Sequence, residues 1–317
     1  MATHSSDSIS YQALNSAEKI SVLSDMLNIS VDCIKLINVD GTIVFMNRSG
    51  CEALGVDPEE KDFGMDWLAL LPESVHKKGR QALNQAIQGE CAGFRGISLS
   101  ADHSTVYWDN MLTPVCDEQG KTVSILCISR NITGQVEAEK KLRFLGEHDP
   151  LTGLANRRTF STHLKNEIVL AKKTGTRFGL LFIDLDNFKH INDTLGHAAG
   201  DKAIKQASSE LKKLSPPGSM ISRLGGDEFA VIVRCQDAAA LADIAHHLLL
   251  SINRNVQFRK ARATFGITIG AALFPEHGLR PEELLNAADN AMYLQKKAGK
   301  NGFRFYSAES SRQSVTF

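Results

Sequence analysis

Short apolar runs alternate with longer amphipathic segments through the second half of the chain, and this alternation restricts the fold more than any other feature. The run RFGLLFIDLD, residues 177–186, has the length and continuity of a buried strand. The segment AGDKAIKQASSELKKL, residues 199–214, places Ile204, Leu211 and Leu214 on one face of a helix. Repeated alternation of this kind predicts an α/β layer with a mixed sheet.

The remaining segments of the second half extend the same pattern. We expect further strands at SMISRL, FAVIV, ATFGITIGAAL and GFRFY. We expect further helices after DPLTGLANRR, at DAAALADIAHHLLLSI and at RPEELLNAADNAMYLQKKAG.

The first half of the chain has a different, strand-rich pattern. In CIKLINVDGTIVFMN two apolar runs are joined by Asp40-Gly41, a dipeptide that tolerates positive φ and favours a hairpin. A mixed helical stretch follows to about residue 90. Three more strand-like runs come next, FRGISLS, STVYWDNMLTPV and KTVSILCISRNI.

The composition is that of an ordinary globular protein, with 43% apolar and 23% charged residues among 317. This length suggests about two domains. Lys and Arg total 36, as do Asp and Glu, and this balance argues against a general nucleic-acid or anionic-membrane binder. The start, MATHSSDSIS, has no signal-peptide pattern, and no apolar run approaches the ~20 residues that span a bilayer. We expect a cytoplasmic protein with no membrane insertion and no nucleic-acid partner.

Acidic residues stand at the end of the predicted buried strand and in a later glycine turn. Side chains alternate along a strand, so Asp184 and Asp186 share one face and Leu185 points away. The stretch SRLGGDEFAVIV carries Asp227 and Glu228 between two apolar runs. If the two strands are neighbours, Asp184, Asp227 and Glu228 converge, and a hard divalent cation such as Mg²⁺ would relieve their repulsion.

The two glycines before these acids have a possible role in the same site. Gly225 and Gly226 lack a Cβ, so the turn can take unusual backbone angles and a ligand can lie against the main chain. On this chemistry alone, a nucleotide-phosphate site and a turn decorated with solvated acids both remain open.

The strand-rich half resembles a PAS domain. The segments DGTIVFMNRSGCEALG and YWDNMLTPVCDEQGKTVSILCISRNIT carry the resemblance, which covers about residues 20–135. It implies a small antiparallel sheet wrapped by helices, often a sensor or a dimerisation unit. The ligand is unknown, and haem, flavin, a small metabolite or side chains alone could fill the interior.

An amphipathic segment follows the PAS-like half. In ITGQVEAEKKLRFLGEHD, four apolar residues fall near helical spacing among Glu and Lys: Ile132, Val136, Leu142 and Leu145. This pattern predicts a linker helix, and two copies could pair as a short coiled coil. A helix that lies on its own domain is the alternative.

The second half resembles the GGDEF domain of diguanylate cyclases. DPLTGLANRR, DLDNFKHINDTLGHAAGD, RLGGDEFAV and ADNAMYLQKKAGKN carry the resemblance in order, over about residues 147–310. It implies condensation of two GTP into cyclic di-GMP with release of two pyrophosphates, in a homodimer that brings two half-sites together. The implied fold class is α+β, with an antiparallel PAS sheet, a linker helix and a palm-like mixed-sheet domain.

The resemblance implies domain ranges and roles for single residues. The ranges are a tail and helix at 1–20, the PAS sensor at 21–134, the linker at 135–148, the GGDEF domain at 149–310 and a tail at 311–317. The implied metal ligands, for Mg²⁺ or Mn²⁺, are Asp184, the Leu185 carbonyl, Asp227 and Glu228.

The remaining roles concern the GTP substrate and the reaction. Either Asp227 or Glu228 serves as the base, and Lys189 is a further catalytic residue. The residues implied to bind GTP are Phe188, Asn192, His197, Asp201, Gly225, Gly226, Lys296 and Lys300. Within this set Phe188 and Lys189 are expected in a loop over the phosphates, and Asn192 and Asp201 at the guanine edge. Asp186 is expected to orient a neighbour. The alternative function is a catalytically silent module that binds GTP or a partner protein.

Overall fold

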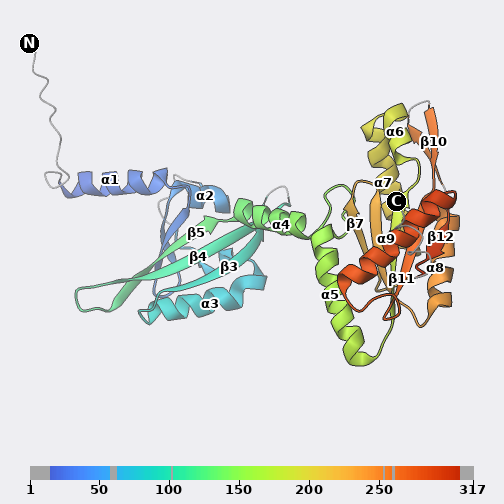
Figure 1. Ribbon diagram of the computed structural model, residues 1–317. Coiled ribbons are helices and arrows are strands. Elements are labelled where there is room, and N and C mark those ends of the chain that lie inside the picture. Colours follow the sequence, from blue (N-terminus) through green and yellow to red (C-terminus); the bar gives the residue numbers. More distant parts are fainter. Residues whose placement is uncertain (1–14, 58–62, 101–102, 253, 259–260, 308–317) are drawn as a thin grey trace, which may run out of the picture. The chain divides into compact units, whose positions relative to one another are not determined.

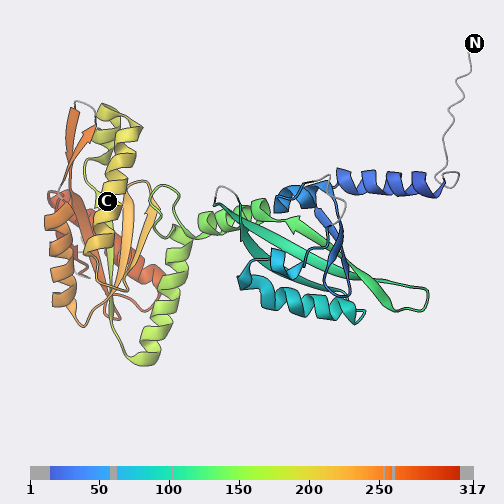
Figure 2. The same cartoon turned by 180° about the vertical axis from the view of Figure 1, so that it is seen from behind.

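A computed structural model describes residues 15–57, 63–100, 103–252, 254–258 and 261–307. The chain divides into two compact units, Met1–Lys140 and Lys141–Phe317. Each unit has its own sheet, as the cartoon views show (Figures 1 and 2). Each unit also has its own buried core. We describe the units separately.

The first unit is an antiparallel sheet in the order β2-β1-β5-β4-β3, packed against α3. The predicted hairpin at Asp40-Gly41 is confirmed, since β1 pairs with β2 and Gly41 has φ 93°. The three later strand predictions are also confirmed. The elements are α1 (Ser16–Ile29), β1 (Cys33–Asn38), β2 (Ile43–Met46), α2 (Arg48–Leu54), the 3₁₀ turn η2 (Leu68–Leu70), α3 (Glu73–Ile87), β3 (Ala92–Leu99), β4 (Thr105–Cys116) and β5 (Thr122–Asn131).

Helix α4 (Thr133–Glu147) occupies the place where the sequence predicts an amphipathic linker helix over residues 135–148. The boundary between the two compact units, Lys140 to Lys141, falls inside it. No described side chain of α4 is fully buried, and Leu142, Phe144 and Leu145 are exposed apolar residues on it.

The second unit has a mixed sheet in the order β12-β11-β6-β8-β7, with helices on both faces. Only the pairing of β11 with β12 is parallel among the described strand pairs of this sheet. The elements are α5 (Arg157–Thr174), β6 (Phe178–Leu185), α6 (Phe188–Leu195), α7 (His197–Leu214), β7 (Met220–Gly225), β8 (Glu228–Arg234), α8 (Ala238–Ile252), β9 (Arg254–Phe258), β10 (Ala261–Phe265), β11 (Ile267–Phe274), α9 (Pro281–Ala298) and β12 (Phe303–Phe305).

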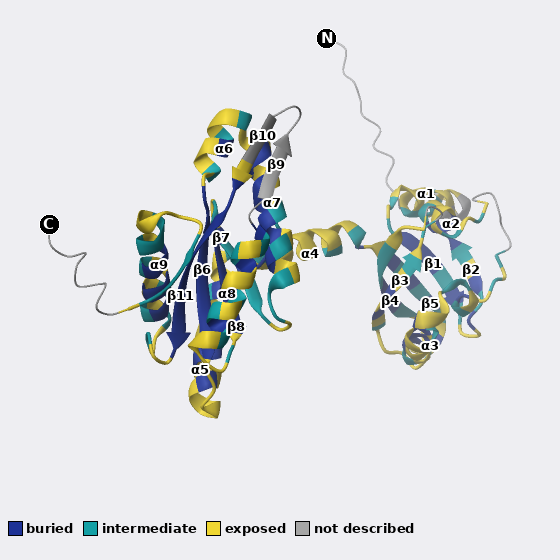
Figure 3. Cartoon of the chain, turned by 90° about the vertical axis from the view of Figure 1, so that its right-hand side faces the viewer, coloured by how far each residue is buried: buried dark blue, intermediate teal, exposed yellow. Residues whose placement is uncertain are grey.

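The central strand β6 divides the core of this unit into two layers. Every residue of β6 is buried, as the dark blue strand in Figure 3 shows. Leu181, Ile183 and Leu185 pack with α7 and α8, whereas Leu180 and Phe182 pack with α5 and α9. The alternation of a strand therefore places Asp184 on the α5/α9 side and Leu185 on the other, as the sequence predicts.

The fold class predicted from the sequence is confirmed, and three local details differ. Helix α6 and strand β9 were not predicted, and ATFGITIGAAL is two strands, β10 and β11, separated at Gly266. Strand β10 leaves the main sheet to pair with β9. A glycine inside a strand pattern often marks such a bend, because it offers no side chain to pack and weakens the ladder.

Among the residues that the structure describes, no helix is long and apolar enough to cross a membrane.

Candidate active site

Two acidic positions face each other at the ends of neighbouring strands. Strands β6 and β8 are antiparallel, and Asp184 lies directly opposite Glu228. The Leu185 amide donates to the Asp227 carbonyl at 3.2 Å, which ties the glycine turn to the end of β6. The two strands that carry these acids are therefore neighbours, as the convergence of the acids requires. Residues directly opposite in a ladder point to the same face, so Asp184 and Glu228 share the α5/α9 side.

The buried carboxyl of Asp184 is held beside an ammonium. Asp184 is 6% exposed, and its carboxylate lies 2.6 Å from Lys296 Nζ on α9. Burial, together with the negative charges of Asp227 and Asp186, raises the pKa of Asp184 to about 6, although Lys296 acts to lower it. A second positive charge at this position would lower the cost of ionising the carboxyl.

Asp186 differs from Asp184 in its partners. Both of its carboxylate oxygens accept hydrogen bonds from Thr268 Oγ1, at 2.8 and 3.0 Å, and one also accepts from the backbone N–H of Asn301 at 2.8 Å. These bonds tie the end of β6 to β11 and to the segment after α9. The arrangement supports the interpretation that Asp186 orients its neighbours.

Acidic and basic side chains line one cavity of about 250 Å³ beyond the end of β6. Its described lining comes from β6, α6 and α9 and from three connecting segments, which lie after β6, before β8 and after α9. Lys300 Nζ donates to Asn187 Oδ1 at 3.1 Å and so reaches across this lining. The lining residues are Asp184, Leu185, Asp186, Asn187, Phe188, Lys189, His190, Asp227, Lys296 and Lys300.

The cavity lies at the start of helix α6. Phe188 and Lys189 form the first turn of this helix, whereas the sequence placed them in a loop. Phe188 is half-buried against the core, and Lys189 is exposed. A helix N-terminus presents free N–H groups and a partial positive charge, and this one opens beside three lysines. Both features favour a phosphate group in the cavity.

The predicted guanine-contacting residues lie on the next pair of helices. Asn192 is half-buried on α6, and the exposed residues His197 and Asp201 are on α7. Gly200 lets the two helices approach, because a Cβ at this position would clash with Asn192 Oδ1. The side-chain amide of Asn192 therefore lies against Gly200, the residue that directly precedes Asp201.

The glycine turn between β7 and β8 is open to solvent. Gly225 has φ 152° and Gly226 has φ 51°, angles that L side chains rarely adopt, and a Cβ at either residue would meet nothing within 4 Å. The glycines are therefore needed for the backbone conformation, and open space remains in which a ligand can contact the main chain.

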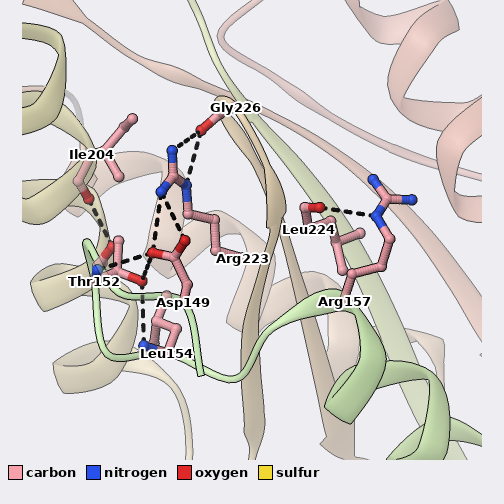
Figure 4. Close-up of polar contacts among 9 residues, drawn as sticks. Asp149, Thr152, Leu154, Arg157, Ile204, Arg223, Leu224 and Gly226 are labelled. Carbon is pink, nitrogen blue, oxygen red and sulfur yellow. Dashed lines mark hydrogen bonds and ion pairs between the residues drawn. The ribbon is translucent and has the colours of Figure 1, made fainter. Parts of the chain in front are cut away.

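Arg223, which the sequence analysis did not single out, fixes this turn through hydrogen bonds. Arg223 donates to the Gly226 carbonyl at 2.7 and 3.0 Å and to both oxygens of Asp149 at 3.0 and 3.1 Å (Figure 4). Burial raises the pKa of Asp149, but hydrogen bonds from Thr152 and Arg223 outweigh burial and lower it. Asp149 is thereby kept as the anionic partner of the turn.

A second missed arginine lies at the start of α5. Arg157 donates to the Leu224 carbonyl at 2.9 Å, as Figure 4 shows, and its guanidinium is 3.4 Å from the Glu228 carboxylate. Both arginines stand in stretches that the sequence singled out, DPLTGLANRR and SRLGGDEFAVIV. Apart from the bonds of Arg223 to Gly226, their contacts join residues 67 to 74 positions apart, and no local pattern predicts such pairs.

The donor chemistry of the site suits a hard cation. Asp184, Asp227 and Glu228 offer carboxylate oxygens and Leu185 offers a carbonyl, the ligand types that Mg²⁺ accepts. In the described part of the chain, however, no three His, Cys, Asp or Glu side chains are already gathered around one metal position. The Lys296 ammonium stands against Asp184 instead.

Comparisons with known families match the two units in order. The model of the family described as "Diguanylate cyclase, GGDEF domain" matches residues 146–302, and the model described as "PAS fold" matches residues 27–137. The PAS and GGDEF predictions are therefore confirmed.

Individual relatives agree with these matches. Signaling protein YkoW of Bacillus subtilis is 30% identical over 290 residues, which is 88% of this chain and 34% of YkoW. Diguanylate cyclase TpbB of Pseudomonas aeruginosa is 37% identical over 159 residues, which is 50% of this chain and 37% of TpbB. The chain thus spans about a third of the length of these curated relatives.

A solved structure allows the same comparison in three dimensions. The GGDEF domain of Pseudomonas aeruginosa TpbB is 34% identical, with a TM-score of 0.52, and the match covers 54% of this chain and 100% of that domain. With the matching family models, this similarity shows that the chain belongs to the GGDEF family and carries a PAS domain ahead of its GGDEF domain.

Proposed function

We propose that this protein is a diguanylate cyclase that condenses two GTP into cyclic di-GMP and two pyrophosphates. One observation carries the proposal: Asp184 at the end of β6, Asp227 in the open glycine turn, and lysines from α6 and α9 line one cavity. The description of the matched family and the name of the relative TpbB support it. A cytoplasmic location belongs to the proposal, because GTP is a cytoplasmic substrate.

The reaction forms and breaks one phosphorus–oxygen bond at each of two α-phosphates. The 3′-hydroxyl oxygen of one GTP attacks the α-phosphorus of the other, the hydroxyl proton is lost, and pyrophosphate leaves. The same step in the opposite direction closes the ring. Positioning and charge stabilisation account for most of the catalysis in such transfers.

The residues of this chain have distinct tasks in that reaction. Asp184, Asp227, Glu228 and the Leu185 carbonyl would hold Mg²⁺ or Mn²⁺. When bound, such a cation neutralises triphosphate charge and polarises the phosphoryl group. Asp227 or Glu228 accepts the proton of the attacking hydroxyl, because Asp227 lies in the glycine turn and Glu228 directly follows it.

Other side chains bind and orient the nucleotide. Lys189, Lys296 and Lys300 attract the β- and γ-phosphates beside the start of α6, where Phe188 stands. The Gly225-Gly226 backbone contacts the nucleotide. Asn192 and Asp201 offer an amide and a carboxylate that match the acceptor and donor groups of the guanine edge, with His197 beside them.

One chain supplies one GTP site, so the proposal requires a second copy. In a homodimer the two sites face each other, and each GTP provides both a nucleophile and an electrophile. The PAS half would control how the two sites meet through α4, where Leu142, Phe144 and Leu145 are exposed. Signal would then act on geometry and leave the chemistry of each half-site unchanged.

The test is product analysis by mass spectrometry after incubation of the purified chain with GTP and Mg²⁺. We expect cyclic di-GMP and two pyrophosphates per product. The Asp227→Asn variant should lose product by at least about a hundredfold while keeping its melting temperature. The matched control is Asp243→Asn, which changes an exposed acid on α8 and should retain full activity. GTP binding without product would indicate a silent module, and absence of GTP binding would refute the proposed substrate.

A further inference from the structure

The first unit contains a cavity of about 410 Å³. It is lined from β1, β3, β4 and β5, and from α2, η2 and α3. Much of its described lining is apolar and includes Leu71, Val75, Phe94, Ile97 and Trp108. The volume is more than twice the ~150 Å³ of an engineered cavity that accommodates benzene. It also falls within the range of about 300–1,000 Å³ typical of small-molecule sites.

One lysine in this lining is almost fully buried. Lys35 on β1 is 5% exposed. Its ammonium contacts Cys33 Sγ at 2.7 Å and Ser129 Oγ at 3.3 Å. Ser129 Oγ in turn donates to Asn110 Oδ1 at 2.7 Å. Cys33, Ser129 and Asn110 are register partners across β1, β5 and β4, so the polar groups form a single row on the inner face of the sheet.

The ammonium of Lys35 has no carboxylate partner within the described part of the chain. Burying an unpaired ammonium costs several kcal/mol even after the protein relaxes around it. The neutral thiol of Cys33 and hydroxyl of Ser129 recover part of this cost, but they do not neutralise the charge. A lysine at this position, in an otherwise apolar cavity, is therefore suited to an anion that enters from outside the chain.

We propose that this cavity binds a small organic acid, whose carboxylate pairs with Lys35 and whose apolar body packs against the aliphatic and aromatic lining. A single ammonium matches the single charge of a carboxylate, and a phosphate would bring more charge and more acceptors than this row can satisfy. The Trp108 indole, which donates to Ser98 Oγ at 2.8 Å, provides a flat apolar surface beside the row. This proposal concerns binding alone and does not depend on cyclase activity.

The first test compares an acid with its neutral counterpart on the full chain, by isothermal titration calorimetry. The probes are 2-naphthoate and 2-naphthalenemethanol, which share a ring system and differ in charge. We expect the acid to bind at least ten times more tightly than the alcohol. Equal affinity for the two probes, or no binding of the acid, overturns the proposal. This comparison needs no variant, so it stands even if changes at residue 35 prevent folding.

The second test assigns the difference to Lys35. In Lys35→Met the acid should lose at least tenfold in affinity and the alcohol should bind as before. The melting temperature of the ligand-free chain should rise, because an unpaired buried charge is removed. Lys121→Met, at an exposed lysine of the turn before β5, is the matched control and should change neither affinity. If Lys35→Met keeps the preference for the acid, the assignment is wrong.

A third variant excludes an internal counter-charge. A Cys33 thiolate could also pair with Lys35, and it would show a thiolate absorbance band that disappears in Cys33→Ala. We expect no such band, and we expect Cys33→Ala to retain the preference for 2-naphthoate. A thiolate band together with no acid binding to the parent chain would show that Cys33 neutralises Lys35 and would refute the proposal.

Discussion

At the scale of single residues, the ionised carboxyl of Asp184 is unfavourable in the metal-free active site. Its carboxyl is buried, repelled by Asp227 and Asp186, and neutralised in part by Lys296. A carboxyl in such surroundings favours either a proton or a cation. The burial and negative surroundings that make Asp184 a suitable metal ligand therefore lower the stability of the metal-free protein.

The raised pKa of Asp184 predicts how the free energy of unfolding depends on pH. The pKa of Asp184 rises from 3.8 to about 6 on folding, so the folded state binds a proton more tightly than the unfolded chain. Its contribution to stability is fully present below the unfolded value and is lost as pH rises through about 6. In chelator, Asp184→Asn should raise the free energy of unfolding at neutral pH by on the order of 1–3 kcal/mol.

Denaturant unfolding at several pH values measures this difference. The gain from Asp184→Asn should shrink as pH falls from 6 towards 3.8, because the parent carboxyl becomes neutral as well. Asp243→Asn serves as the control for removing an exposed acid. A gain that does not depend on pH, or a loss of stability at neutral pH, would contradict the assigned environment of Asp184.

At the scale of elements, the site depends on two contacts between neighbouring segments. The first is the fork of Arg223, which joins the Gly226 carbonyl of the glycine turn to Asp149 ahead of α5. Arg223→Lys keeps the charge but cannot make the paired bonds of a guanidinium. We expect it to cost about 1–2 kcal/mol of stability and to lower kcat for cyclic di-GMP formation more than it raises KM for GTP.

The strand β8 offers a matched control for this substitution. Arg234 forms a similar paired contact with Glu167, at the opposite end of the strand from the glycine turn. Arg234→Lys should lower stability by a comparable or smaller amount and leave kcat unchanged. Equal loss of kcat in both variants would mean that Arg223 contributes only to general stability and does not position the turn.

The second contact is the close packing of α6 against α7 at Gly200. A methyl group in Gly200→Ala would clash with Asn192 Oδ1 and displace the amide that is proposed to contact guanine. We expect KM for GTP to rise by roughly tenfold, since overpacking typically costs 1–3 kcal/mol. Gly134→Ala in α4, where a Cβ would meet nothing within 4 Å, is the control and should leave KM unchanged. An unaltered KM in Gly200→Ala would count against the role of Asn192.

Comparison with the sequence shows which features short-range patterns can predict. The apolar run of β6 and the hairpin around Gly225-Gly226 were predicted because alternation and turn residues act over a few positions. Helix α6, with eight residues, is too short for its periodicity to stand out. The pairs Arg223–Asp149 and Lys296–Asp184 depend on how distant segments pack, and the sequence carries no local signal for them.

At the scale of the whole molecule, the chain has one proposed sensing half and one proposed catalytic half. The cavity around Lys35 in the first unit is the proposed site for a small acid, and α4 provides the covalent connection to the GGDEF domain. Each chain contributes a single GTP site in the proposed mechanism. Activity must therefore depend on how often, and in which geometry, two copies meet.

The most direct test is the rate of cyclic di-GMP formation per chain, measured by mass spectrometry at saturating GTP and Mg²⁺ over a wide range of protein concentrations. We expect cyclic di-GMP to form, and we expect the rate per chain to rise with concentration until all chains are dimeric. Sedimentation at the same concentrations should show the monomer giving way to the dimer over that range. Absence of cyclic di-GMP, or a constant rate per chain at concentrations where the protein is monomeric, would contradict the proposed mechanism.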